Sequence, residues 1–217
     1  MLSIHPAQAG PRIRVIVDTD AKNEADDQYA IVHAALTPMF DLRGVIAAHY
    51  GTLRHPESMR QSRLEVDKLY GLLGLTPNYP IVDGAERAIP DETTPSRSQG
   101  AELIVREALR DDTDTPLFVA FFGPLTEMAS ALLTAPEIAE RDVTVVWIGG
   151  GPYPDGGQEY NLSNDIAAAN VVFDSSVRLW QVPSSTYKLM AVSYAELMVK
   201  VAPHGDLGAY LVDQLVE

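Results

Sequence analysis

The chain has 217 residues, 46% of them hydrophobic, and its 30 acidic and 16 basic side chains give a formal net charge of −14. This composition predicts a soluble globular domain over residues 1–217, and the charge argues against nucleic acid or an anionic membrane as a partner. The absence of cysteine excludes disulfides and thiolate metal sites. Residues 1–12 lack the apolar core of a signal peptide and no run approaches membrane-spanning length, so we expect a cytoplasmic protein.

The first predicted strand, Ile13 to Val17, is a continuous apolar run of the kind found in strands buried on both faces. A short polar loop separates it from a predicted helix that begins at Asp26. Four carboxylates are concentrated at this joint, namely Asp18, Asp20, Asp26 and Asp27. In open α/β sheets the carboxyl end of a strand is where ligands bind.

Carboxylates at this spacing repel one another unless a cation lies among them. Ca²⁺ and Mg²⁺ are the cations that best suit oxygen-only ligands. Asp26 and Asp27 could instead cap the helix and offset its dipole. Capping accounts for one or two carboxylates but not for four, so the sequence favours a metal or polar-ligand site here.

Downstream, apolar runs alternate with amphipathic patterns, which predicts a mostly parallel sheet flanked by helices. Strands are expected at residues 42–48, 80–82, 117–122, 143–148 and 177–182, and helices around residues 66–73, 101–108, 125–132 and 165–173. Residues 84–99 are rich in proline and polar residues and predict a long surface loop. The chain after residue 182 is predicted to be mainly helical.

Two further strand ends carry distinctive sequence, Phe122-Gly123-Pro124-Leu125-Thr126 and Gly149-Gly150-Gly151. Because parallel strands end at one edge of a sheet, both segments are expected near the first acidic cluster. The second segment leads to Glu159 and Asn161, which alternate on one face if the chain there is extended. A carboxylate and an amide so placed suit the vicinal hydroxyl groups of a sugar. His49 also ends a predicted strand, and we interpret it as a hydrogen-bonded structural histidine.

In order along the chain, these motifs resemble those of the inosine-uridine-type nucleoside hydrolases (nucleoside N-ribohydrolases). The resemblance rests on the two Asp pairs, on Gly-Pro-Leu-Thr, and on Gly-Gly followed by Glu-Tyr-Asn and an Asp before an Ala-rich helix. It implies an α/β fold with a Rossmann-like core, and Ca²⁺ as the cofactor. It also implies metal ligation by Asp20, Asp27 and the Phe122 carbonyl, and ribose contacts by Asp26, Glu159 and Asn161.

The chain departs from the family pattern at several points. The usual glycine between the two Asp pairs is missing, and residues 21–25 make a longer loop in which the roles of Asn23 and Glu24 stay open. Glu127 stands where the family has Asn. Family members continue beyond this length and supply a His-Asp pair that includes another calcium ligand, so we expect a domain that is C-terminally truncated relative to the family.

The resemblance implies hydrolysis of the N-glycosidic bond of a ribonucleoside or related N-riboside, with Asp20 as the base that deprotonates a calcium-activated water. It implies a small-molecule partner and a homo-oligomer. One alternative is a non-catalytic ribose- or nucleoside-binding module on the same fold. Another is a Mg²⁺-dependent aspartyl-phosphate phosphatase with Asp18 as nucleophile, which also needs a phosphate-binding lysine in a setting that Lys188 lacks.

Overall fold

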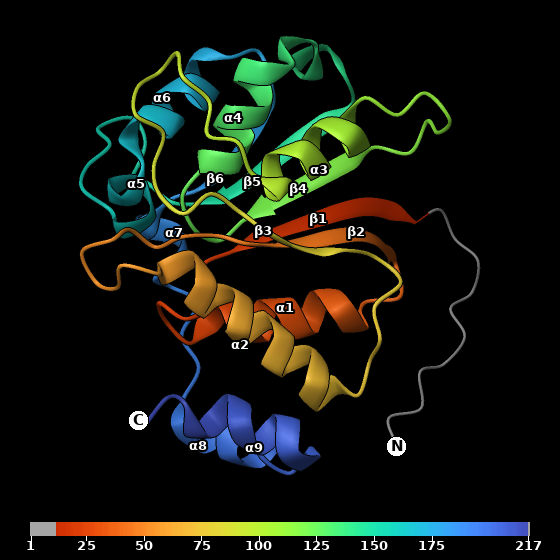
Figure 1. Cartoon of the computed structure of the whole chain (residues 1–217). Helices are drawn as coiled ribbons and strands as arrows, with labels where there is room; N and C mark the ends of the chain where they lie inside the picture. The colour runs from red at the N-terminus through yellow and green to blue at the C-terminus, as the bar shows by residue number, and fades with distance from the viewer. Residues whose placement is uncertain (1–11, 217) are drawn as a thin grey trace.

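Six strands, all paired in parallel, form the sheet of the computed structural model, which describes residues 12–216 (Figure 1). The strand order is β3-β2-β1-β4-β5-β6. The strands are β1 (Ile13–Thr19), β2 (Phe40–Ala47), β3 (Ile81–Asp83), β4 (Leu117–Phe121), β5 (Val143–Ile148) and β6 (Arg178–Val182). The predicted parallel sheet flanked by helices is therefore confirmed.

Helices cover both faces of this sheet (Figure 1). One layer holds α1 (Asp26–Leu36) and α2 (Ser58–Leu73), with α9 (Gly205–Asp213) packed on α2. The opposite layer holds α3 (Gln99–Ala108), α4 (Thr126–Thr134) and α6 (Ile166–Asp174). The shorter elements are α5 (Tyr160–Asn164), α7 (Ser184–Tyr187), α8 (Tyr194–Lys200) and the 3₁₀ helix η1 (Pro136–Glu140).

Successive residues of the central strand β1 enter different cores, because side chains alternate between the two faces of a strand. Ile16 is buried in the core formed with α3, α4 and α6. Val15 and Val17 are buried in the core formed with α1, α2 and α9. This two-sided burial explains why β1 reads as an unbroken apolar run rather than as an alternating pattern.

The order of the strands reverses between β1 and β4. The chain moves outward from β1 to β2 and β3, then returns to β4 and moves outward the other way to β5 and β6. Loops at the carboxyl ends of β1 and β4 therefore diverge to opposite sides of the sheet and leave a crevice between them. Such a topological switch point is the usual ligand site of an open α/β sheet.

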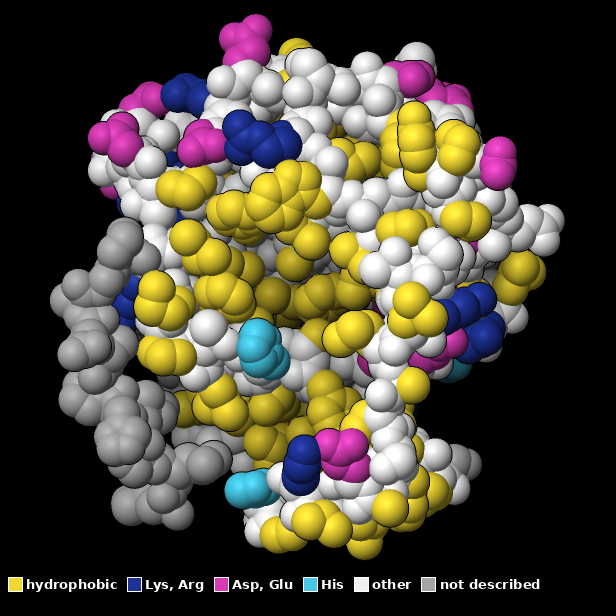
Figure 2. Space-filling view, turned by 180° about the vertical axis from the view of Figure 1, so that it is seen from behind, with side chains coloured by type: hydrophobic (Ala, Val, Ile, Leu, Met, Phe, Trp, Pro, Cys, Tyr) yellow, Lys and Arg dark blue, Asp and Glu magenta, His cyan; other side chains and the backbone are white. Residues whose placement is uncertain are grey.

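One half of the sheet is only partly covered on the side of α1 and α2. Phe118, Ala120, Val146, Trp180 and Val182 lie on this side by their strand register, and none of them is fully buried. Phe118 packs against Trp180 with ring centroids 5.6 Å apart, and Trp180 is 54% exposed. We call these five residues the open face. Figure 2 shows hydrophobic side chains lining a hollow between the main body and the C-terminal helices.

The structure differs from the sequence prediction in one segment that bears on function. Residues 159–161 were expected to be extended, but helix α5 begins at Tyr160 and Glu159 is its N-cap. The prediction failed because alternating polar residues over three positions fit both a strand and the first turn of a short helix. Within residues 12–216, no helix is both long and apolar enough to cross a membrane.

Candidate active site

The carboxyl ends of β1 and β4 are joined directly by main-chain contacts. The amide of Phe122 donates a hydrogen bond of 2.9 Å to the carbonyl of Asp18. Gly123 follows, and a Cβ atom at this position would lie 3.0 Å from Cγ of Asp20. Glycine therefore lets the loop after β4 approach the Asp20 carboxylate closely, which closes one wall of the crevice.

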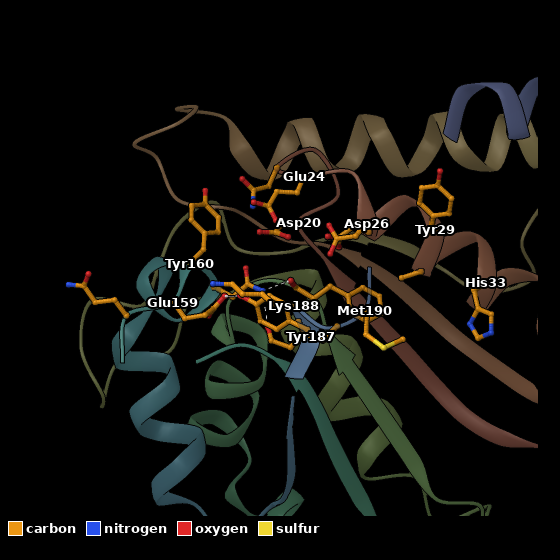
Figure 3. A pocket seen from close by; sticks show the side chains of 17 residues that line it. Asp20, Glu24, Asp26, Tyr29, His33, Glu159, Tyr160, Tyr187, Lys188 and Met190 are labelled. Carbon is orange, nitrogen blue, oxygen red and sulfur yellow. Dashed lines mark hydrogen bonds between the residues drawn. The ribbon is translucent and has the colours of Figure 1, made fainter. Parts of the chain in front are cut away.

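A cavity of about 930 Å³ opens at this switch point. Its lining includes all six residues that the sequence analysis selected, namely Asp20, Asp26, Asp27, Phe122, Glu159 and Asn161. Figure 3 shows Asp20, Glu24 and Asp26 along one side of the cavity, with Glu159, Tyr187 and Lys188 on the other. Residues from four separate stretches of the chain are thus brought together at the predicted edge of the sheet.

The two carboxylates predicted to bind metal are both buried, whereas Asp26 is exposed at the cavity. The hydroxyl of Thr19 donates a hydrogen bond to Oδ1 of Asp27, which turns the first helical turn of α1 back toward the end of β1. Residue 25 is the N-cap of α1 and makes no side-chain cap. Asp26 and Asp27 therefore lie in the first turn of the helix, and neither acts as its N-cap.

Two of the carboxyl groups here are buried in different surroundings. Oδ2 of Asp20 has no hydrogen bond to any described residue, whereas the carboxyl group of Asp18 shares a side-chain hydrogen bond with that of Glu127. Burial, together with the neighbouring carboxylates, raises the pKa of Asp18 and of Asp20 well above the ordinary value. Burial likewise raises the pKa of Asp27 to about 8, partly offset by the hydrogen bond from Thr19. A cation among these groups would stabilise their charged forms.

The donor chemistry at the cavity fits a hard divalent cation, since Asp27 lines the cavity beside Asp20, whose buried Oδ2 is left without a partner among the described residues. The carbonyl of Phe122 accepts one hydrogen bond, of 2.7 Å from Asn161, and keeps a second lone pair. Across residues 12–216, however, no three His, Asp or Glu side chains converge in the way that a preformed metal site requires. A cation here would be held by Asp20, Asp27 and the Phe122 carbonyl, with water completing its coordination.

Glu159 is held in place by three hydrogen bonds. Its Oε2 accepts from the amides of Gly150 (2.8 Å) and Leu162 (3.0 Å), and its Oε1 accepts from the hydroxyl of Tyr187 (2.9 Å). Gly150 has φ of 75°, a left-handed conformation that favours glycine and aims its amide at the carboxylate. Glu159 thus caps α5 and fastens the glycine turn after β5, while still lining the cavity.

Asn161 bridges the ends of two strands. Its Nδ2 donates to the carbonyl of Phe122 (2.7 Å), directly after β4, and to that of Ile148 (2.8 Å), the last residue of β5. Its Oδ1 accepts no hydrogen bond from the described residues. The amide is therefore oriented by the sheet, and its free oxygen can accept a hydrogen bond from a ligand hydroxyl group in the cavity.

Below the cavity, a buried chain of hydrogen bonds ties three elements together. Nε2 of His49 lies 2.8 Å from Oγ1 of Thr126, and Thr126 donates to Oδ2 of Asp165 at 2.6 Å. The amide of Gly51 donates to Nδ1 of His49, so Nε2 carries the proton. Burial lowers the pKa of His49 to about 4. His49 is therefore a neutral structural histidine, as the sequence analysis interpreted it.

The cavity also contains residues that the sequence analysis did not select. Tyr187, Lys188 and Met190 reach it from the segment after β6, and Tyr29 and His33 from α1. The segment after β6 could have been anticipated, because β6 ends at the same sheet edge as β4 and β5. The sequence did not predict that Tyr29 and His33 line the cavity, because their spacing is that of ordinary positions in an amphipathic helix.

The geometry argues against the aspartyl-phosphate alternative. Asp18 would be the nucleophile in that chemistry, but its side chain is fully buried and is absent from the cavity lining. A nucleophile must reach the phosphorus atom of its substrate. Lys188 does line the cavity, contrary to the sequence-based view of its setting, but without an accessible Asp18 it does not complete a phosphatase site.

Comparison with known proteins agrees with this description. The sequence profile of a family described as inosine-uridine preferring nucleoside hydrolase matches residues 15–215. The chain is also 25% identical to an uncharacterized protein of Schizosaccharomyces pombe, over 79% of this chain and 61% of that protein. The chain thus spans 61% of the length of this relative.

Solved structures with the same fold include a plant nucleoside hydrolase, with a TM-score of 0.74, 19% identity and coverage of 94% of this chain and 70% of that one. A purine-preferring ribonucleoside hydrolase from Gardnerella vaginalis has a TM-score of 0.75 and 20% identity, with 94% and 72% covered. A type III effector complexed with adenosine diphosphate ribose has a TM-score of 0.74 and 16% identity, with 96% and 66% covered. At these identities the likeness shows the fold.

Proposed function

Because the chain belongs to the family of inosine-uridine preferring nucleoside hydrolases, we propose that it hydrolyses the N-glycosidic bond of a ribonucleoside or a related N-riboside. The observation that carries this proposal is the cavity at the switch point, where the six selected residues meet and where the buried Oδ2 of Asp20 has no partner among the described residues. The substrate is a small molecule, and Ca²⁺ is the proposed cofactor.

In this proposal Asp20 is the general base. A bound calcium ion would lower the pKa of a water molecule in the cavity. The Asp20 carboxylate takes a proton from that water, the water oxygen bonds to the anomeric carbon, and the bond to the base breaks with its electron pair leaving on the base nitrogen. Asp20, Asp27 and the Phe122 carbonyl would hold the cation.

The other carboxylates have an electrostatic role in the same step. Positive charge develops on the sugar as the glycosidic bond breaks, because the transition state resembles an oxocarbenium ion. Asp26 and Glu159 place negative charge around the ribose, where it stabilises that developing charge. Asn161 Oδ1 accepts a hydrogen bond from a ribose hydroxyl, and its Nδ2 stays bonded to the strand ends.

A non-catalytic N-riboside-binding module is the second candidate. It is favoured by the finding that no three acidic or histidine side chains converge within residues 12–216, because a loosely held cation would orient a water poorly. It is also in keeping with the complex of one structural relative with adenosine diphosphate ribose.

Ribose release from a panel of nucleosides, with Ca²⁺ and with a chelator, tests the proposal. We expect release that depends on Ca²⁺ and that falls by about 10²- to 10⁴-fold in Asp20→Asn. Asp114→Asn is the matched control, since Asp114 is an exposed carboxylate in the turn before β4, at the opposite edge of the sheet. Nucleoside binding without ribose release would favour the binding module instead.

A further inference from the structure

A second cavity, of about 570 Å³, adjoins the acidic cavity and shares Tyr160 with it. Its lining includes Arg54 and Arg87 and contains no Asp or Glu. Acidic side chains outnumber basic ones by 30 to 16 in this chain, so an arginine-lined cavity beside a carboxylate-rich one is a marked separation of charge. A ligand that extends through both cavities would meet negative groups at one end and positive groups at the other.

Arg54 is fixed at the boundary between the two cavities. Its Nη1 donates a hydrogen bond of 2.8 Å to Oδ1 of Asn23, and its guanidinium lies 4.7 Å from the ring centroid of Tyr160. Asn23 and Tyr160 both line the acidic cavity. Figure 3 shows Tyr160 on the same side of that cavity as Asp20 and Glu24.

The positive charge of Arg54 is not neutralised by a neighbour. Among the described residues it forms no ion pair, and Arg87 pairs only with the exposed Glu86, at the limiting distance of 4.0 Å. Some other arginines are paired closely, as Arg43 is with Glu107 at 2.9 Å and Arg63 with Asp83 at 2.9 Å. Arg54 therefore keeps guanidinium donors available to a ligand.

The turn that carries Arg54 adds main-chain donors. Gly51 has φ of 78°, and a Cβ at this position would lie 2.7 Å from Oδ1 of Asn164, so only glycine lets the turn lie against α5. The amides of Thr52 and Leu53 donate no hydrogen bond to any described residue. Free amides beside a guanidinium are the donors that proteins use to hold phosphate.

We propose that this second cavity, the anion subsite, binds a phosphate ester carried by the same riboside whose ribose lies in the acidic cavity. The inference rests on the proposed function and narrows its substrate class to phosphorylated N-ribosides. The planar guanidinium of Arg54 matches the geometry of a phosphate group. Tyr160, shared by the two cavities, lies where the sugar and its phosphate would be joined.

Calorimetry with ribose and ribose 5-phosphate, in the presence of Ca²⁺, tests the subsite. We expect the wild-type chain to bind ribose 5-phosphate about tenfold or more tightly than ribose, with a preference that weakens as salt is added. Arg54→Gln should abolish the preference. Arg97→Gln should keep it, because Arg97 is an exposed arginine outside both cavities.

Two outcomes would overturn the subsite. One is equal affinity of the wild-type chain for the two sugars. The other is an equal loss of both affinities in Arg54→Gln, which would show that Arg54 only holds the Asn23 loop in place.

Inorganic pyrophosphate separates this inference from the proposed function, because its binding needs no hydrolysis. Pyrophosphate binding that disappears in Arg54→Gln would support the subsite even in a chain that releases no ribose. Ribose release from nucleosides with no preference for their 5′-phosphates, and with no pyrophosphate binding, would support the hydrolase and overturn the subsite.

Discussion

The side-chain amide of Asn161 donates a hydrogen bond of 2.7 Å to the main-chain carbonyl of Phe122, two residues that lie 39 positions apart in the sequence. Phe122 directly follows β4, and Asn161 lies in the first turn of α5. The same amide holds the carbonyl of Ile148 at the end of β5. One side chain thus fixes the relative positions of the strand ends that carry the candidate active site.

Asn161→Ala should therefore lower stability even without a ligand. The change removes two hydrogen bonds and leaves two partly buried carbonyls unpaired, which costs about 1–3 kcal/mol in the free energy of unfolding. Asn170→Ala is the control, because Asn170 is an exposed helical residue whose side chain bonds only to Glu92 among the described residues, and its loss should change stability by less than about 0.5 kcal/mol. Urea denaturation of both variants measures the difference. If Asn161→Ala lowers the free energy of unfolding no more than Asn170→Ala does, the hydrogen bonds from Asn161 to the strand ends contribute nothing to stability.

The buried carboxyl groups should make the metal-free chain less stable as pH rises. Burial raises the pKa of Glu127 to about 7 from an ordinary value near 4.5. At a pH between these two pKa values, the folded chain keeps a proton on Glu127 that the unfolded chain releases. The free energy of unfolding is therefore greatest below about pH 4.5 and falls as the pH rises to about 7. The contribution of Glu127 is on the order of 3 kcal/mol.

Thermal denaturation between pH 5 and pH 8, with a chelator present, checks this expectation. The melting temperature should fall with pH in the wild-type chain and fall less steeply in Glu127→Gln, which cannot ionise. Glu140→Gln should leave the slope unchanged, because Glu140 is exposed and its side chain makes no hydrogen bond or ion pair with a described residue. A wild-type melting temperature that rises over this range would contradict the argument.

The sequence predicted the strands, the parallel sheet and the edge at which the site lies, because each depends on local apolar patterns and on the chain order of the elements. It also predicted that Asp20, Asp27 and Glu159 would share one cavity, since all three follow strands that end at the same edge. The sequence could not predict which hydrogen-bond partners each side chain of the site has. Glu159 has its carboxylate engaged by two amides and a hydroxyl, and those partners become neighbours only in the folded chain.

The sequence did not predict the anion subsite either. Arg54 and Arg87 are isolated basic residues 33 positions apart in a chain with 16 basic residues, and nothing in their local pattern marks them. Their shared cavity arises because the turn after β2 and the long loop after β3 both pass beside α5. Such a meeting of loops depends on the tertiary fold, which local periodicity does not encode.

Calcium should stabilise the chain through Asp27. Adding Ca²⁺ at pH 8 should raise the melting temperature, because the cation binds the folded state and compensates the buried carboxylates. The increase should be smaller at pH 6, where these carboxylates hold protons that compete with the metal.

In Asp27→Asn the calcium-induced increase in melting temperature should largely disappear, because the uncharged amide of asparagine binds Ca²⁺ less well than a carboxylate does. Asp114→Asn, at the far edge of the sheet, should retain it. An Asp27→Asn chain that responds to Ca²⁺ as the wild type does would remove Asp27 from the proposed ligand set.

The open face predicts self-association. Trp180 is 54% exposed on this face, whereas the other tryptophan, Trp147, is 1% exposed inside the core. Burial of the open face against a second copy would remove apolar surface from water, which favours association by about 25 cal/mol for each Å² buried. Light scattering over a range of protein concentrations should therefore show oligomers. Acrylamide should quench the fluorescence of Trp180 less as the protein concentration rises.

Trp180→Ser should shift the wild-type chain toward the monomer. Leu53→Ser is the matched control, because Leu53 is a fully exposed hydrophobic residue outside the open face, and its loss should leave the association unchanged. If the association were a non-specific consequence of exposed apolar side chains, both variants would weaken it to a similar extent. If the wild-type chain stays monomeric at every concentration and acrylamide quenches the fluorescence of Trp180 fully, the open face stays in contact with water.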